Sequence, residues 1–204
     1  TRLIALSRIP RGVLPDEAYG AYNAWGLMTE GLDSRGYPYP VYFVAWVSGM
    51  RVLYSYLAIP MFKLFGVNIL AYRLPQVIVG IFTVYGIYRL GKELFDAKMA
   101  LLLAFVLSIN PWHIMNTRFG LDANMAPGMF VIGLMFLTLG IKKKSSYLVG
   151  AAAFLGASLY CYALAWIVVP LFLLLCIAMF WKRVPRGRYP IVFTVLLFFI
   201  ALPL

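Results

Sequence analysis

Carboxylates are scarce in this sequence. Asp and Glu together number 7 among 204 residues, Lys and Arg number 18, and charged residues make up only 12% of the chain. A soluble domain carries about 25% charged residues, so the composition excludes that class and favours a membrane protein. Cysteine is rarer still, and both Cys161 and Cys176 lie inside apolar runs. This excludes a disulfide framework and a cysteine metal site, and we expect both thiols to act as small core side chains.

The net charge of +11 does not point to a nucleic-acid partner. The basic residues mostly lie between apolar runs, where the positive-inside rule places them in a membrane protein. We therefore expect the lipid bilayer, and no nucleic acid, to surround this chain. Because the sequence opens at Thr1 and stops at Leu204 inside an apolar run, we also expect it to be part of a longer protein, and a membrane anchor before residue 1 is consistent with that.

Apolar segments in the later part of the sequence predict six membrane spans, near residues 69–90, 99–116, 122–141, 146–162, 164–181 and 189–204. The first, third and fifth connections are basic, whereas the second holds only Arg118 and the fourth holds no charge. The basic connections should lie in the cytoplasm. Everything before residue 69, together with the segments near 116–122 and 162–165, is then predicted to share the outer face.

Residues 1–68 are predicted to form an outer-face loop with amphipathic helices, and residues 69–204 a truncated bundle of about six spans. From Pro15 the apolar side chains recur at helical spacing, the acids that follow suit a helix N-terminus, and Gly31 suits its end. A second, shorter apolar helix is expected over residues 52–65. The predicted fold class is all-α, a polytopic membrane helical bundle with amphipathic juxtamembrane helices in a large first outer loop.

The few carboxylates concentrate on one side of this bundle, since five of the seven fall at the outer face: Asp16, Glu17, Glu30, Asp33 and Asp122. Asp16, Glu17 and Asp122 each stand near the start of a predicted helix, where the helix dipole alone explains an acid. For Asp122, pairing with Arg118 is a further structural explanation. Their convergence on one membrane face favours function instead, because a cleft with two or three acids suits a general base or a metal ion.

Several motifs, taken in order, carry a family resemblance: Pro15-Asp16-Glu17-Ala18 in the first outer loop, Leu53-Tyr54-Ser55-Tyr56-Leu57-Ala58-Ile59-Pro60, Tyr72-Arg73-Leu74-Pro75 opening a span, Gly91-Lys92-Glu93-Leu94-Phe95 inside, and Asn110-Pro111-Trp112-His113 leading to Arg118 and Asp122. Their order and topology resemble those of the membrane glycosyltransferases of the GT-C class. Within that class, the chain is similar to the protein O-mannosyltransferases and the lipid A aminoarabinose transferases, and the resemblance spans nearly the whole chain.

The resemblance implies an enzyme that takes a sugar from a polyprenyl-phosphate donor and transfers it, with inversion, to a lipid, glycan or protein acceptor on the outer face. Inversion needs a base for the acceptor hydroxyl, and the position of Asp16 in its motif implies that role. Glu17 is then expected to orient the helix or an adjacent cation. Asp122 matches the second outer-loop acid of the family, which helps to shape the acceptor or metal site.

Cations near the leaving phosphate would stabilise its developing charge, and the outer-face candidates are Arg51, Arg118 and Arg73. Many members of the family carry Lys-Pro-Pro where this chain has Met-Arg-Val, and the guanidinium of Arg51 is a suitable substitute. For Arg73 we favour an interfacial, snorkelling side chain. The motif positions add Tyr54 and His113 to the substrate- or phosphate-binding candidates.

Structural alternatives remain for several of these residues. His113, beside Trp112, suits an interfacial position, and its use as a metal ligand with Asp16 and Asp122 is the minority interpretation. An aromatic belt at the outer interface explains a further group without any function, namely Tyr160, Tyr162 and Trp166.

Two alternatives remain for the function itself. A multi-span transporter or lipid flippase would have a similar number of spans, but such proteins often carry internal repeats and mid-membrane sites, whereas this sequence shows no repeat and places its acids at one face. A membrane scaffold without catalytic activity is the other alternative. The glycosyltransferase hypothesis predicts a bacterial plasma-membrane protein with its active site on the outer face.

Overall fold

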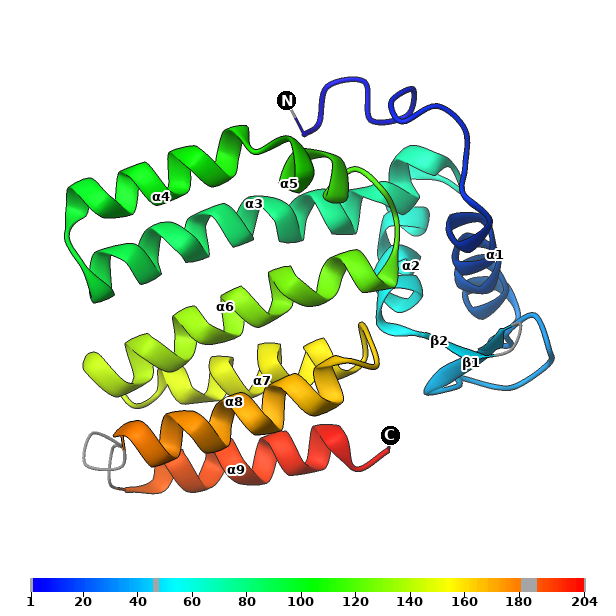
Figure 1. The fold of residues 1–204 in the computed structure, drawn as a ribbon. Coiled ribbons are helices and arrows are strands. Elements are labelled where there is room, and N and C mark those ends of the chain that lie inside the picture. The colour runs from blue at the N-terminus through cyan, green and yellow to red at the C-terminus, as the bar shows by residue number, and fades with distance from the viewer. Residues whose placement is uncertain (1, 46–47, 181–186, 204) are drawn as a thin grey trace.

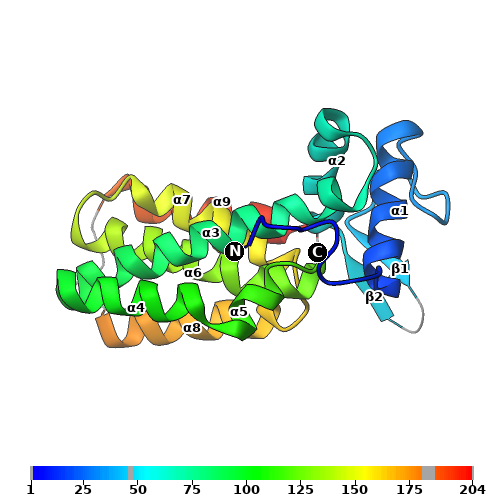
Figure 2. The same cartoon turned by 90° about the horizontal axis from the view of Figure 1, so that it is seen from above.

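The computed structural model describes residues 2–45, 48–180 and 187–203, and its main body is a bundle of antiparallel helices (Figure 1). These helices are α3 (Ile69–Leu94), α4 (Ala97–Ile109), α6 (Asp122–Lys142), α7 (Tyr147–Leu159), α8 (Ala165–Phe180) and α9 (Arg188–Ala201). They run along one direction in both views, so the connections after α3 and α6 lie at one end and the connections after α4 and α7 lie at the other (Figures 1 and 2). We call these ends the inner and the outer end.

The predicted fold class, a helical membrane bundle, is confirmed, but its helices differ in length. Within the described ranges, α3 and α6 are the two helices that are long and apolar enough to cross a membrane. The other bundle helices contain 13 to 16 residues. At about 1.5 Å per residue they fall short of a hydrocarbon core of about 30 Å.

The predicted span over residues 99–116 is wrong in one respect, because it consists of two helices, α4 and α5 (Pro111–Asn116). Asn110 between them is extended, and its side chain accepts a hydrogen bond from the amide of His113 at 3.0 Å. Pro111 has no amide hydrogen to donate and disfavours helical backbone at the preceding residue. The helix therefore ends at Ile109 and a new one begins.

A layer of short elements crosses the outer end of the bundle (Figure 2). It contains α1 (Pro15–Thr29), β1 (Tyr42–Ala45), β2 (Ser48–Arg51) and α2 (Leu53–Phe65). Both predicted outer helices are confirmed, and α1 ends before Gly31, whose φ of +72° suits glycine. The antiparallel pairing of β1 with β2 corrects the expectation of a purely helical layer, and it reflects the aromatic and β-branched side chains of β1.

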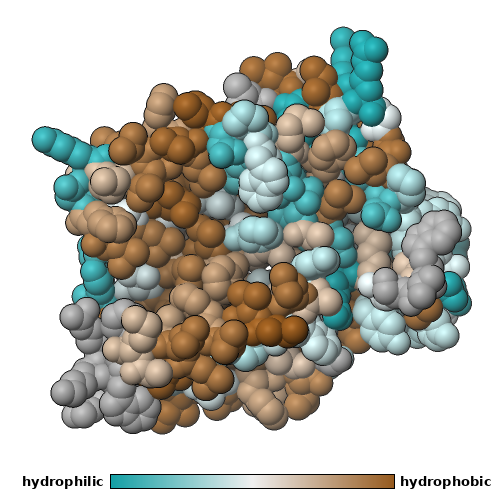
Figure 3. All heavy atoms as spheres, in the orientation of Figure 1, coloured by the Kyte–Doolittle hydropathy of each residue, from teal (hydrophilic) through white to brown (hydrophobic). Residues whose placement is uncertain are grey.

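Small side chains let the bundle helices approach one another. Ala151 and Ala152 of α7 are fully buried, and a Cβ atom at Gly133 of α6 would lie only 2.7 Å from Leu155 of α7. The main core joins the outer layer to the bundle, because it combines residues of α1, α2, α3 and α6. On the face shown in Figure 3, the surface of the bundle is mainly hydrophobic, and hydrophilic residues gather at its inner end and around the outer layer.

Candidate active site

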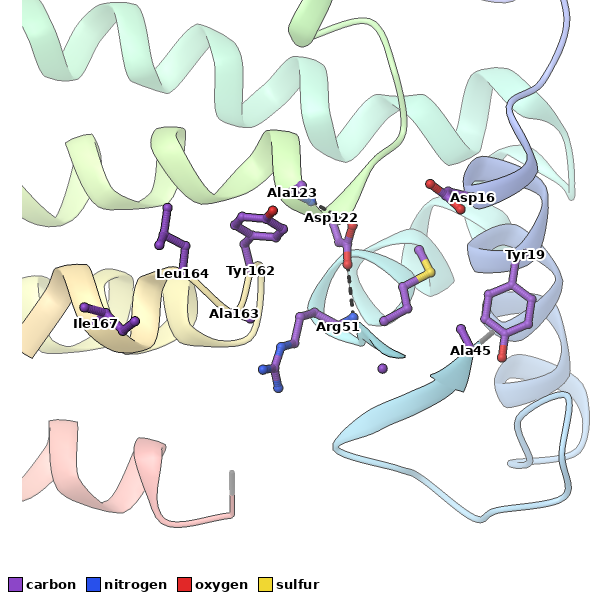
Figure 4. A pocket seen from close by; sticks show the side chains of 12 residues that line it. Asp16, Tyr19, Ala45, Arg51, Asp122, Ala123, Tyr162, Ala163, Leu164 and Ile167 are labelled. Atoms are coloured by element: carbon purple, nitrogen blue, oxygen red, sulfur yellow. Dashed lines mark hydrogen bonds between the residues drawn. The ribbon is translucent and has the colours of Figure 1, made fainter. Parts of the chain in front are cut away.

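A cavity of about 650 Å³ lies between the outer layer and the outer end of the bundle (Figure 4). Its walls come from α1, the β1–β2 hairpin, the start of α6 and the residues from the α7–α8 connection into α8. The polar side chains that line it are Asp16, Tyr19, Arg51, Asp122 and Tyr162. The structure thus brings together two acids and one cation that the sequence had selected separately.

Asp122 is the first residue of α6, and backbone amides hold both of its carboxylate oxygens. Its Oδ2 accepts a hydrogen bond from the amide of Arg51 at 3.0 Å, and its Oδ1 accepts one from the amide of Ala123 at 2.7 Å. The carboxylate therefore ties the end of β2 to the start of α6 and keeps a fixed orientation in the cavity wall. These bonds take the place of the pairing with Arg118 that the sequence suggested.

Asp16 is the second residue of α1, and it is exposed. Its side chain extends from α1 on the side of the cavity, and Tyr19 lines the same cavity one turn further along (Figure 4). The hydroxyl of Tyr19 donates to the carbonyl oxygen of Val44 at 3.1 Å, which fixes the ring against β1. Sequence reasoning missed Tyr19, although its spacing of three residues from Asp16 on a predicted helix was a usable signal.

Glu17 follows Asp16 but is fully buried. Arg73 donates to it through Nε and Nη2, one bond to each carboxylate oxygen and both 2.8 Å long. The amides of Gly120, at 2.7 Å, and Leu14, at 3.3 Å, donate to it as well. Burial opposes the ionisation of Glu17, but the bonds from Arg73 and Gly120 outweigh it and hold the pKa of this carboxyl below its ordinary value. Glu17 therefore joins α1, α3 and the loop before α6.

Two buried arginines hold the N-terminal segment onto the bundle. Arg73 is fully buried, so its interpretation as a snorkelling interfacial side chain is wrong. Its Nη atoms donate to the carbonyl oxygens of Leu6, Pro10 and Gly12. Arg118 is also buried, and its guanidinium donates to the carbonyl oxygens of Arg2, Ile4 and Ile9. Both guanidinium groups thus bind backbone that sequence reasoning could not place.

Arg51 is the cation that lines the cavity. Its guanidinium carbon lies 4.6 Å from the centre of the Trp166 ring, a cation–π contact that orients the side chain. Trp166 is held in turn by a hydrogen bond from its ring Nε1 to the carbonyl oxygen of Leu159 at 3.0 Å. Tyr162 lines the cavity nearby. Two members of the predicted aromatic belt therefore contribute to this site or support it.

Two of the predicted binding residues lie away from the cavity. Tyr54 is fully buried in the core, and its hydroxyl donates to the carbonyl oxygen of Tyr72 at 2.7 Å. His113 is buried too, with its Nδ1 2.7 Å from Nη2 of Arg2. It lines a separate cavity of about 150 Å³ between α3, α5 and α6. In this structure both side chains make structural contacts.

This arrangement reduces the set of metal ligands that the sequence suggested. Across the described part of the chain, no three metal-ligating side chains gather at one point. Because His113 lines another cavity, a divalent cation would have Asp16 and Asp122 as its protein ligands. Mg²⁺ is commonly held by one or two carboxylates together with substrate phosphates. The two acids therefore fit such an ion only when a phosphate is bound beside them.

Comparison with known proteins bears on both the family and the fold. The sequence profile of the dolichyl-phosphate-mannose-protein mannosyltransferase family matches residues 52–204. The fold matches crystal structures of ArnT from Cupriavidus metallidurans, with a TM-score of 0.78 for the apo state and 0.76 for the state bound to undecaprenyl phosphate. In each case the identity is 16%, and the match covers 99% of this chain and 38% of the ArnT chain. No curated protein matches the sequence.

The fold and the family profile define the class as a membrane glycosyltransferase of the GT-C type. The chain belongs to the dolichyl-phosphate-mannose-protein mannosyltransferase family. The family predicted from the order of motifs is thereby confirmed. The chain spans 38% of the length of the ArnT structures that it matches.

Proposed function

We propose that this chain carries the outer-face active site of a glycosyltransferase that uses a sugar linked to a polyprenyl phosphate. The sugar passes with inversion to an acceptor on the outer face, which is a lipid, a glycan or a protein. The observation that carries the proposal is the shared cavity that Asp16, Asp122 and Arg51 line. Family membership and the fold shared with ArnT bound to undecaprenyl phosphate support a lipid-phosphate donor.

Asp16 is the proposed general base, because its carboxylate is exposed at the cavity whereas backbone amides or Arg73 engage those of Asp122 and Glu17. The acceptor oxygen attacks the anomeric carbon from the side opposite the phosphate, and its proton passes to Asp16. The new carbon–oxygen bond forms as the bond to the phosphate oxygen breaks. The polyprenyl phosphate leaves with that electron pair.

Asp122 is proposed to position the acceptor. A carboxylate offers about four lone-pair sites, and the amides of Arg51 and Ala123 use two of them. Two sites thus remain for hydroxyl groups of a substrate in the cavity. Glu17 is proposed to support both acids from behind, because it stands next to Asp16 and binds the amide two residues before Asp122.

Arg51 is proposed to bind the leaving phosphate, since a guanidinium can donate two parallel hydrogen bonds to phosphate oxygens. It lines the cavity, whereas Arg118 donates to the backbone of the N-terminal segment. An apolar groove of about 290 Å³ between α6 and α8 shares Ala123, Tyr162 and Leu164 with the cavity. This groove suits the first isoprene units of the donor.

The test is sugar transfer by the full-length protein from a radiolabelled polyprenyl-phosphate donor. Asp16→Asn should lower kcat by roughly 10²- to 10⁴-fold, the range of general base catalysis. Its thermal stability should stay unchanged, because Asp16 is exposed. Glu30→Gln is the matched control, an exposed acid just beyond the other end of α1. Near-normal transfer by Asp16→Asn would remove Asp16 as the base.

The same assay separates the alternatives. Movement of the lipid donor across the membrane without bond formation would establish a transporter or flippase instead.

Binding of a divalent cation is the alternative role for Asp16 and Asp122. Loss of transfer on chelation, restored by Mg²⁺ in the wild type and only at higher Mg²⁺ in Asp122→Asn, would assign Asp16 and Asp122 to an ion held with the donor phosphate.

A further inference from the structure

A second large cavity lies at the inner end of the bundle, away from the acidic site. It has a volume of about 790 Å³ and is bounded by α3, α6 and α8. Its walls are almost entirely apolar, with leucines of α3 and α6 on one side and Phe172 of α8 on the other. The polar groups that line it belong to Thr138, Lys142 and Cys176.

Uneven packing of α8 leaves this cavity open. Near its outer end α8 is packed closely, since Ala165 and Val169 are buried in a core cluster. Phe172 still packs edge-on against Phe130 of α6, with ring centres 5.3 Å apart. Beyond Phe172, Leu175 is 53% exposed. In Figure 1, α6 lies between α3 and α8, the other two helices that line this cavity, so α6 is the floor of an apolar groove.

The mouth of this groove is positively charged. Lys142, the last residue of α6, lines the groove, and Lys143 and Lys144 follow it. Lys143 pairs with the carboxylate of Glu93 at 2.8 Å, whereas Lys142 donates to the backbone carbonyl of the same residue. Glu93 thus engages two of these three lysines, Lys143 through its carboxylate and Lys142 through its backbone carbonyl. Within the described residues, Glu93 is the acid that forms an ion pair with this basic connection.

We propose that this groove binds an anionic phospholipid of the cytoplasmic leaflet, with an acyl chain along α6 and α8 and the headgroup phosphate at Lys142. Basic pockets between spans on the cytoplasmic side commonly bind anionic headgroups. The volume lies within the range of about 300–1,000 Å³ that is usual for small-molecule sites. The long apolar stem of Lys142 can line the groove while its ammonium group reaches the headgroup region. The proposal is independent of sugar transfer, because the acidic site lies at the other end.

Cys176 provides a natural reporter, since its half-buried thiol lines the groove whereas the other described cysteine, Cys161, is fully buried. The full-length protein, with Cys176 as its sole reactive cysteine, is placed in nanodiscs of phosphatidylcholine with increasing phosphatidylglycerol. Modification of Cys176 by a membrane-permeant maleimide is then followed over time. Phosphatidylglycerol should slow the modification in a saturable way. Lys142→Gln should need about fivefold more phosphatidylglycerol, the factor equivalent to about 1 kcal/mol per basic side chain.

Lys98→Gln is the matched control, because Lys98 is an exposed lysine at the same membrane face that does not line the groove. Lys98→Gln should leave the phosphatidylglycerol dependence of the modification rate unchanged. Thr138→Phe, which fills the groove, should make that rate independent of phosphatidylglycerol without unfolding the protein. Equal shifts in Lys98→Gln and Lys142→Gln would mean a diffuse surface potential and overturn the site. The lipid site would also be overturned if Cys176 reacted at the same rate with and without phosphatidylglycerol. A Cys176 that did not react in either membrane, because another part of the protein fills the groove, would overturn it too.

Discussion

Replacing Glu17 with Gln is expected to destabilise the protein by about 3 kcal/mol. Removal of one partner from a buried ion pair leaves an uncompensated charge, at a cost of about 3–5 kcal/mol, and Glu17 and Arg73 are both fully buried. We take the lower end because Arg73 keeps bonds to three backbone carbonyl oxygens of the N-terminal segment. The side-chain amide introduced by Glu17→Gln cannot replace the ion pair, since its NH₂ group would face the N–H donors of Arg73.

The assay is thermal unfolding of the full-length protein in one detergent, followed by tryptophan fluorescence. At roughly 2–4 °C per kcal/mol for a unit of this size, Glu17→Gln should lower Tm by about 6–12 °C. Glu30→Gln, an exposed acid next to the same helix, should change stability by no more than about 0.5 kcal/mol. The double variant Glu17→Gln, Arg73→Gln removes both charges and should recover part of the loss. A Tm for Glu17→Gln that differs from the wild type by only about 1–2 °C would correspond to at most about 1 kcal/mol. That result would refute the reasoning.

The pH dependence gives an independent check on the same ion pair. The pKa of Glu17 is lower in the folded protein than its ordinary value, so its ionisation stabilises the fold above the unfolded pKa of about 4.3. That contribution is lost as the pH falls from about 4.3 through the lowered folded pKa. The wild type should therefore lose stability in this acid range, and Glu17→Gln should show a shallower decline. Parallel curves for the two proteins would show that another group causes the acid sensitivity.

Three further variants test other contacts. Arg51→Ala should raise the KM for the lipid donor about tenfold or more, because a hydrogen bond to a charged group contributes about 1.5–3 kcal/mol. Arg51→Lys should recover only part of this loss, since lysine lacks the planar guanidinium group. An unchanged KM in both variants would remove Arg51 from the phosphate site. Tyr54→Phe should lower the free energy of unfolding by about 1 kcal/mol, because the hydrogen bond to the carbonyl oxygen of Tyr72 is lost. Its transfer kinetics should stay unchanged, and a raised KM for the donor would return Tyr54 to the binding residues. Gly133→Ala should destabilise the bundle by about 1–3 kcal/mol, because its Cβ would press on Leu155. Thermal unfolding measures this loss, with Glu30→Gln, at an exposed acid just beyond α1, as the neutral control.

The sequence was sufficient for the features that depend on local pattern. Apolar runs located the bundle helices to within a few residues, and Pro15 and Gly31 marked the limits of α1. The alternation of basic connections predicted that residues 1–68 share one end with the segment before Asp122, and the described part of that range lies there (Figure 1). The sequence alone is therefore sufficient to predict that Asp16 and Asp122 share one face.

Features that depend on long-range pairing were not accessible from the sequence. Arg73 lies in the first turns of a span, where an interfacial arginine is usual, and nothing local indicates that its partner is Glu17, 56 positions earlier. The hairpin of β1 and β2 was missed because its strands have only four residues each. The break at Asn110 was visible as a residue before proline, but an apolar run from 99 to 109, interrupted at Ser108, outweighed it.

The neighbouring acids Asp16 and Glu17 are best understood as one exposed group and one anchor. Consecutive residues of a helix point about 100° apart, so at this position one carboxylate meets the cavity and the other enters the core. The anchor also binds the amide of Gly120, two residues before Asp122. The carboxylate of Glu17 therefore stands next to Asp16 in the sequence and binds the backbone two residues before Asp122. A shift of Glu17 would displace Asp16 and Asp122 together, so transfer should fall in Glu17→Gln even where Arg73→Gln has recovered part of the stability.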